Sequence, residues 1–293
     1  MPDAQKQTVQ WFPGHMAKTR RQIKESLPLV DAVTELRDAR VPLSSTNPEL
    51  NGLIEKKPKI VLLNKADLAD PAITAAWVRF YASEGIPALA VDCRSGRGLQ
   101  LYRKTVNEVL KEKIERNAAK GMAGKALRVM VVGIPNTGKS SFINRMAGKG
   151  TARVEDRAGV TRHNKWYVIG DGLELLDTPG VLWPKFEDPE VGIKLAFTGG
   201  VKDQVLDIES LAMRLLEVLA ALYPDRLAER YKLKEGFADL PSYELLELVA
   251  RRRGMLVSGG EADTERAAVM LFDELRGGKL GKISFEKPPE TRE

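Results

Sequence analysis

Residues 133–140 read Gly-Ile-Pro-Asn-Thr-Gly-Lys-Ser and carry the strongest chemical signal in the sequence. Four residues separate its two glycines, and Lys139 and Ser140 follow, which is the pattern of a phosphate-binding loop. The apolar run 127–132 before it predicts a buried strand, and residues 139–146 predict a helix. Glycines let backbone N–H groups curl around an oxyanion, and a helix N-terminus adds partial positive charge. The stretch therefore predicts a nucleoside triphosphate site.

Two side chains of this loop have specific predicted roles. We expect Lys139 to reach the β- and γ-phosphates and the Ser140 hydroxyl to bind Mg²⁺. The residues of the loop expected to contact nucleotide are Asn136, Thr137, Gly138, Lys139, Ser140 and Ser141.

A second motif, Asn64-Lys65-Ala66-Asp67, follows another short apolar run and predicts the base. The Asp67 carboxylate can accept two hydrogen bonds from the ring and exocyclic nitrogens of guanine, a donor pair that adenine lacks. We expect Asn64 to support the loop and contact the base, and the Lys65 stem to cover the base. Alone, such a turn after a strand is also an ordinary loop. Beside a phosphate loop it indicates guanine.

A loop that closes over guanine is expected after the next strand. Such loops usually read Ser-Ala-Lys, whereas the equivalent stretch here starts with Asp92 and Cys93. Backbone N–H groups of these residues can still contact the base, so we expect Asp92 and Cys93 to bind nucleotide.

The residues that would sense the γ-phosphate follow the phosphate loop in the chain. Asp177 comes directly after an apolar run and can hold magnesium through its water shell, while the Gly180 N–H can contact the γ-phosphate. Thr161 lies between these motifs and is the candidate to close over magnesium, although a lone loop threonine is more often a turn residue. Together the motifs predict a GTP-hydrolysing protein.

The order of the motifs predicts a circular permutation. In ordinary GTPases the phosphate loop precedes the guanine motif, whereas here residues 64–67 precede residues 133–140. A fold depends on spatial neighbours, and chain ends often lie close together, so permutation is tolerated. Alternating strands and helices predict an α/β, circularly permuted P-loop GTPase domain with a parallel sheet. The predicted strands are 32–36, 59–63, 86–91, 127–132, 165–169 and 173–176, and the predicted helices are 17–27, 71–83, 99–115 and 139–146.

The pattern changes after about residue 200, where only helices are predicted, at 208–223, 242–253 and 261–276. We therefore expect a small all-helical C-terminal domain. The predicted domains are a permuted G domain over 1–200, a helical domain over 201–280 and a flexible tail over 281–293.

Composition narrows the partners and the compartment. The net charge of +6 and the pI near 9.2 favour a polyanionic partner, and basic residues cluster in 103–128 and 145–165. A solvated helix face explains either cluster equally well. A single cysteine, Cys93, excludes an intramolecular disulfide and favours a reducing cytoplasm. No apolar run approaches the ~20 residues of a membrane-spanning helix, so we expect no membrane partner.

Several stretches resemble the bacterial ribosome biogenesis GTPase A family. They are the permuted motif order, residues 11–16 (Trp-Phe-Pro-Gly-His-Met), residues 38–42 (Asp-Ala-Arg-Val-Pro) and the phosphate loop with Pro135-Asn136. The resemblance covers essentially the whole chain. It implies a monomeric GTPase switch that binds GTP and GDP, binds rRNA and assists late assembly of the large (50S) ribosomal subunit. It also implies that the ribosomal particle stimulates hydrolysis and that the helical domain contacts RNA.

The resemblance also bears on catalysis. Where Ras-like proteins carry a water-orienting glutamine, Gly180 is followed by Val181. His15 matches the histidine proposed in the family to act instead, although it could merely contact RNA; His163 is the second candidate. Asn136 resembles the asparagine of potassium-activated GTPases, which implies a K⁺ site, but a loop asparagine also tolerates unusual dihedrals.

Three classes of function remain open. The first is a ribosome-assembly GTPase with a stimulated cycle. The second is a constitutive RNA-binding module with a structural GTP site, which would bind RNA independently of the nucleotide. The third is a signalling or trafficking GTPase, which the basic charge and the lack of lipidation motifs disfavour.

Overall fold

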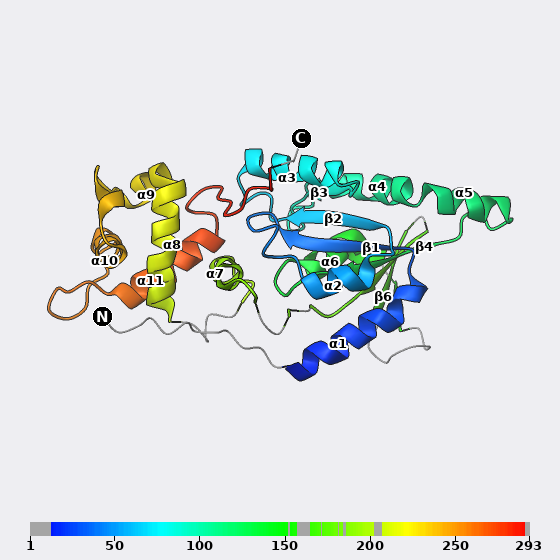
Figure 1. Cartoon of the computed structure of the whole chain (residues 1–293), viewed down its shortest axis with the longest axis horizontal. Helices are drawn as coiled ribbons and strands as arrows, with labels where there is room; N and C mark the ends of the chain where they lie inside the picture. The colour runs from blue at the N-terminus through cyan, green and yellow to red at the C-terminus, as the bar shows by residue number, and fades with distance from the viewer. Residues whose placement is uncertain are drawn as a thin grey trace. The chain divides into compact units, whose positions relative to one another are not determined.

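The computed structural model describes residues 13–151, 153–156, 165–170, 172–180, 182–183, 186–201 and 207–290. These residues form two compact units. The sheet unit contains the described residues up to 187 and, from the chain end, those from 284 onward; the helical unit spans Asp188–Ile283. Figure 1 shows the elements of both units along the chain.

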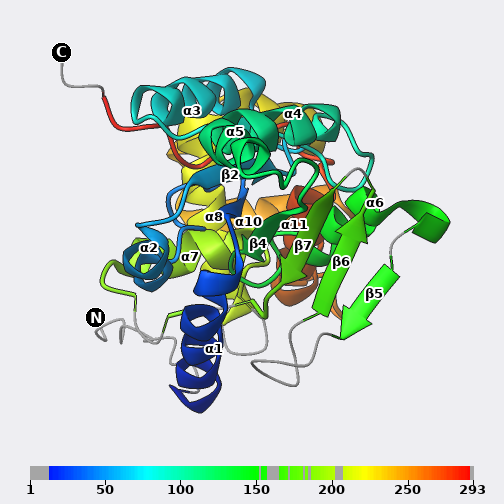
Figure 2. The same ribbon diagram turned by 90° about the vertical axis from the view of Figure 1, so that its right-hand side faces the viewer.

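The sheet unit contains a seven-stranded sheet in the order β3-β2-β1-β4-β7-β6-β5. Strands β3, β2, β1, β4 and β7 are parallel, and at one edge β6 is antiparallel to both of its neighbours, β7 and β5 (Figure 2). Their bounds are β1 Ala32–Asp38, β2 Lys59–Asn64, β3 Ala88–Ala90, β4 Leu127–Val132, β5 Arg153–Asp156, β6 Lys165–Ile169 and β7 Leu173–Asp177. The mostly parallel sheet and the permuted motif order agree with the predicted fold class.

Helices cover both faces of this sheet, which buries the central strands β1, β2 and β4. Phe142 of α6 and Tyr102 of α4 pack edge to face, with ring centroids 5.0 Å apart, against one face. Ile23 of α1, Leu50 of α2 and Trp77 of α3 are buried against the other face. The helices of this unit are α1 Pro13–Ser26, α2 Pro48–Ile54, α3 Pro71–Ser83, α4 Tyr102–Val109, α5 Lys111–Ala119 and α6 Lys139–Thr151, with short 3-10 turns Leu27–Leu29 and Leu99–Leu101.

Several helices begin with the same local signal, a side-chain cap followed by proline. Asn47 accepts a hydrogen bond from the Glu49 N–H at the start of α2, and Asp70 accepts from Ala72 and Ile73 at the start of α3. These caps satisfy N–H groups that have no partner within the helix, and proline at the first position loses nothing there.

The helical unit is built on α8, α10 and α11, which pack against one another. Phe197 of α7 stacks on Phe272 of α11, and Arg276 donates to the carbonyl oxygens of Ala196 (2.7 Å) and Phe197 (3.2 Å) at the end of α7. The helices of this unit are α7 Pro189–Phe197, α8 Ile208–Leu222, α9 Pro224–Tyr231, α10 Ser242–Arg252 and α11 Thr264–Arg276, with a 3-10 turn Phe237–Asp239. No helix in the described ranges is long and apolar enough to cross a membrane.

The structure differs from the sequence expectations in its boundaries. The helical unit begins near Asp188 and not at residue 201, because α7 packs on α11. The tail 281–293 was expected to be flexible, yet Ser284, Phe285 and Glu286 are buried in the sheet unit, which supplies partners for their polar groups. Strand β5 and helices α2, α7 and α9 were not predicted, and the predicted helix 99–115 is divided into a 3-10 turn, α4 and α5.

Candidate nucleotide-binding site

The predicted binding loops leave the same edge of the sheet. Strands β2, β4 and β7 are parallel members of one sheet and end at Asn64, Val132 and Asp177, where the guanine motif, the phosphate loop and the Asp177–Gly180 stretch begin. Ligands of open α/β sheets bind beyond the carboxyl ends of the strands. Chain order is therefore no obstacle to assembling this site.

The phosphate loop follows β4 and is closely packed. A Cβ on Gly133 would lie 2.6 Å from the Leu36 carbonyl oxygen, and a Cβ on Gly138 would lie 2.2 Å from the Asn64 Nδ2. Gly138 also has a φ of 97°, and within the loop Thr137 Oγ1 donates to the Ile134 carbonyl oxygen at 2.8 Å. Only glycine fits both positions, so the pattern predicted from sequence has a steric reason here.

Lys139 lies inside the curl of this loop. Its Nζ donates to the carbonyl oxygens of Gly133 (2.9 Å) and Ile134 (3.0 Å), and the side chain is buried. Burial lowers the pKa of Lys139 to about 8, although the nearby Asp177 carboxylate acts in the opposite direction. A phosphate in the loop would bring negative charge to a poorly solvated ammonium group, which is the arrangement that triphosphate binding uses.

This pKa predicts a pH dependence of nucleotide binding. In the free protein Lys139 is charged below its pKa of about 8 and loses its proton as the pH rises through that value. Bound phosphate would hold the proton, so GDP affinity should fall about fourfold between pH 7 and 8.5. Titration of the protein with GDP across this range measures the effect. Lys139→Arg stays charged and should bind with no such pH dependence; the same slope in that variant would contradict the assignment.

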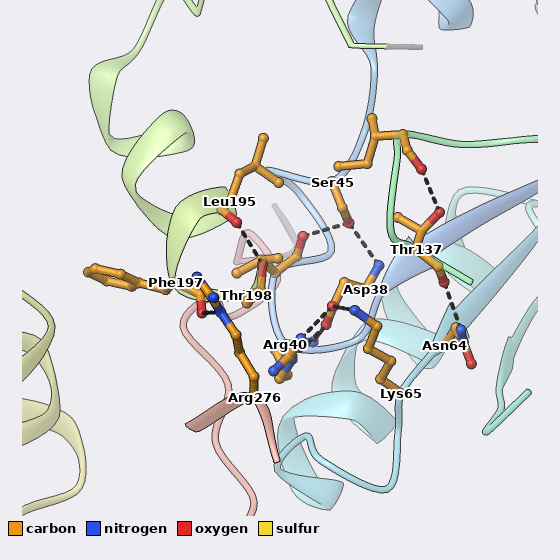
Figure 3. A network of polar contacts seen from close by, with 12 residues as sticks. Asp38, Arg40, Ser45, Asn64, Lys65, Thr137, Leu195, Phe197, Thr198 and Arg276 are labelled. Carbon is orange, nitrogen blue, oxygen red and sulfur yellow. Dashed lines mark hydrogen bonds and ion pairs between the residues drawn. The ribbon is translucent and has the colours of Figure 1, made fainter. Parts of the chain in front are cut away.

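Asn64 joins three of the predicted loops. Its Nδ2 donates to the Thr137 carbonyl oxygen at 2.7 Å (Figure 3). Its Oδ1 accepts from the Cys93 N–H at 2.9 Å. One buried side chain thus links the guanine motif to the phosphate loop and to the loop expected to close over the base. The Asp92 carboxylate accepts from the Arg94 N–H at 2.8 Å, which shapes that closing loop.

Lys65 is held by a buried pair that the sequence motifs did not single out. Its Nζ lies 2.9 Å from the Asp38 carboxylate, and the Arg40 guanidinium donates to both oxygens of that carboxylate at 2.9 and 2.8 Å (Figure 3). Lys65 has a left-handed φ of 60°, an uncommon conformation for a side-chain-bearing residue. Burial opposes ionisation of Asp38, but Arg40 and Lys65 outweigh it and hold the pKa of that carboxyl well below its usual range.

A signal for this pair did exist in the sequence. Asp38 ends a fully buried strand, and the register of β1 and β2 places it opposite Asn64. The stretch 38–42 was used above only for its resemblance to a family. A charged pair directly after a buried parallel strand could have been assigned to the same sheet edge as the guanine motif.

The donor set for a magnesium ion is composed of hard oxygen ligands. Ser140 is exposed in the first turn of α6, and Asp177 is half-buried at the end of β7, the neighbour of β4. Burial raises the pKa of Asp177, whereas Lys139 and Lys165 lower it. Hydroxyl and carboxylate oxygens suit Mg²⁺, which also takes phosphate oxygens and water. Within the described residues no cluster of His, Cys, Asp and Glu forms an all-protein metal cage.

Several predicted site residues lie outside the described residues or have only their backbone described. Thr161, His163, Val181 and Trp11 lie outside the described residues. His15 belongs to α1, of which only the backbone is described at that position. Asn136 is exposed and has a φ of 62°, which fits its role as a loop residue with an unusual dihedral; its role in K⁺ binding stays a prediction.

Comparison with known proteins finds consistent relatives. A family model described as 50S ribosome-binding GTPase matches residues 128–236. Ribosome biogenesis GTPase A of Priestia megaterium is 48% identical over 287 residues, which cover 98% of this chain and 99% of that protein. The protein of the same name from Thermotoga maritima is 32% identical over 96% of this chain and 95% of its own length. The GDP-bound structure of TM YlqF superposes with a TM-score of 0.66 at 31% identity, covering 92% of this chain and 99% of that one.

Proposed function

Because this chain belongs to the ribosome biogenesis GTPase A family, we propose that it binds rRNA of the large ribosomal subunit during late assembly and hydrolyses GTP faster on that particle. The chain is a GTP-binding GTPase of ribosome biogenesis. We propose in addition that it contacts RNA, that the particle stimulates hydrolysis, and that individual residues have the roles given below.

The observation that carries the nucleotide part is the convergence on Asn64. The phosphate loop, the guanine motif and the closing loop meet through this one side chain. We assign guanine to Asp67, phosphates to Lys139 and magnesium to Ser140 and Asp177, with Thr161 completing the ion's shell. Magnesium would supply positive charge to the phosphates, and the chain's part is to hold and orient the nucleotide.

A basic cleft in the helical unit supports RNA binding. It has a volume of about 550 Å³ and lies between α9, the end of α10 and the turn after α11. Arg230 and Arg253 are held in place there by ion pairs to the buried Glu274 carboxylate. Fixed guanidinium groups in a cleft suit phosphate oxygens better than mobile surface lysines. The basic residues that line the cleft are Arg226, Arg230, Lys232, Arg252, Arg253 and Lys279, beside a single acidic residue, Glu229.

Removing charge from this cleft should weaken RNA binding in a salt-dependent way. Arg252 and Lys279 are both exposed, so their replacement by alanine is not expected to unfold the unit. Each lost phosphate contact should reduce the slope of log K against log salt by about 1. Binding of rRNA fragments to the double variant at several salt concentrations measures this. Lys56→Ala, an exposed lysine of the sheet unit, is the control, and an equal loss in both proteins would contradict the assignment.

The chain path offers a way for nucleotide state to reach the helical unit. Residues 181–187 are all that separate Gly180, which would contact the γ-phosphate, from Asp188, where the helical unit begins. Loss of the γ-phosphate would thus act on a short covalent link to the second unit. Affinity for large subunits, measured with GDP and with a non-hydrolysable GTP analogue, tests this switch. Equal affinity in both states would favour a constitutive RNA-binding module.

Two further assignments complete the proposal. Asn136 would supply a ligand to a potassium ion, which would place positive charge where other GTPases insert an arginine. We also propose that the protein acts as a monomer in the cytoplasm, consistent with its buried single thiol, Cys93, whose pKa is raised to about 12 by burial.

A further inference from the structure

The segment Ser284–Glu286 lies in the sheet unit although it follows the helical unit in the chain. Its residues are buried: Ser284 is 2% exposed and Glu286 is 6% exposed. Burial of a carboxylate is costly unless hydrogen bonds or an ion pair satisfy it. The buried Glu286 carboxylate must therefore have partners that compensate for its lost hydration.

Glu286 anchors the loop that follows β1. Its carboxylate accepts hydrogen bonds from the Leu43 N–H at 2.7 Å, from the Ser44 N–H at 3.1 Å and from the Ser44 hydroxyl. Its own carbonyl oxygen accepts from Trp77 Nε1 at 2.9 Å. Charge-assisted bonds to backbone N–H groups are among the stronger hydrogen bonds, so this loop is held firmly.

The two preceding residues contact the neighbouring loops. The Phe285 N–H donates to the Arg40 carbonyl oxygen at 2.8 Å, and Ser284 Oγ accepts from the Asp70 N–H at 3.1 Å. Asp70 caps α3 and lies just after the guanine motif. The segment thus bonds both to the loop after β1 and to the loop after β2.

The loop after β1 in turn holds the guanine motif. The Ala39 N–H donates to the Asn64 carbonyl oxygen at 2.8 Å, and Asp38, fixed by Arg40, pairs with Lys65. Buried and partly buried polar contacts therefore lead from Glu286, through the loop after β1, to Asn64 and Lys65 of the guanine motif. Asn64 also bonds to the phosphate loop through its side chain.

We propose that Ser284–Glu286 is a positioning segment for guanine recognition, holding the loops after β1 and β2 so that Lys65 and Asp67 meet the base. The inference rests on the assignment of guanine to Asn64–Asp67. It gives Ser284–Glu286 a role in nucleotide specificity, although these residues need not touch the nucleotide.

The test compares GDP with inosine diphosphate, which lacks the exocyclic amine that Asp67 would bind. In Glu286→Ala, the loop N–H groups lose their acceptor, and the affinity for GDP should fall about tenfold. The affinity for inosine diphosphate should change much less, so the ratio of the GDP affinity to the inosine diphosphate affinity should fall. Glu290→Ala, an exposed carboxylate of the same tail, should keep the wild-type preference.

The alternative outcomes are distinct. An unchanged preference in Glu286→Ala, together with a lower melting temperature, would make the segment a stabilising contact only and overturn the inference. If that variant does not fold, Glu286→Gln replaces it, because glutamine keeps an acceptor but loses the charge. A smaller ratio of GDP to inosine diphosphate affinity in Glu286→Gln supports the inference, and an unchanged ratio overturns it. A wild-type protein without preference for GDP would instead refute the guanine assignment, and the inference with it.

Discussion

Asp67→Asn should lower the affinity for GTP and GDP by a factor on the order of 10⁴. The carboxylate accepts from two N–H donors of guanine, whereas the asparagine amide would present a donor of its own to them. Xanthine carries a carbonyl oxygen where guanine carries its amine, so the variant should bind xanthosine nucleotides better than wild type does. Burial lowers the pKa of Arg40, whereas the carboxylates of Asp38 and Asp67 raise it, so Asp67 lies near the buried Asp38–Arg40 pair. Titration with guanosine and xanthosine diphosphates measures both changes.

Asp70→Asn is the matched control for this prediction. Asp70 stands three residues further along the chain and caps α3 through its carboxylate oxygen. Asparagine caps helices as well as aspartate does, so this variant should keep its affinity and its base preference. If Asp67→Asn still preferred guanosine over xanthosine diphosphate as strongly as wild type does, residues other than Asp67 would have to recognise the base.

His15→Ala should lower subunit-stimulated GTP turnover by about 10²–10⁴, the usual contribution of a positioned acid–base group, and leave GTP affinity unchanged. The reason is chemical: Gly180 is followed by valine and not by glutamine, and a neutral imidazole can orient or deprotonate water near pH 7. Single-turnover hydrolysis on large subunits separates the chemical step from binding.

Two further variants locate the catalytic group. Lys18→Ala removes an exposed side chain of the same helix and should retain stimulated turnover. His163→Ala removes the only other histidine. Loss of turnover in His163→Ala with normal turnover in His15→Ala would transfer the role to His163.

Local patterns placed the two binding motifs at strand ends, but they did not predict the contacts that support these motifs. The phosphate loop and the guanine motif each follow a short apolar strand, so residue type and neighbours alone place them at a strand end. Glu286 and Ser44 are 242 positions apart, and no local pattern pairs them. The Asp38–Lys65 pair depends on the register of β1 against β2, which periodicity does not encode.

The missed elements have similar explanations. Helix α2 contains Gly52 and spans only Pro48–Ile54, too short for a helical period to stand out. Strand β5 covers Arg153–Asp156, a charged edge stretch that lacks the apolar signal of a buried strand. The tail carries glycine and proline, which suggest a loose end, whereas buried partners in the sheet unit decide its structure.

We propose that this GTPase acts on the large ribosomal subunit, and its GTP turnover reports that action. GTP turnover should be recorded with and without purified large subunits, in potassium and in sodium buffers. We expect slow turnover alone and strong stimulation by the subunit in potassium, with much less in sodium. Turnover that large subunits leave unchanged in either salt would contradict the proposed function, and equal stimulation in both salts would remove the potassium site at Asn136.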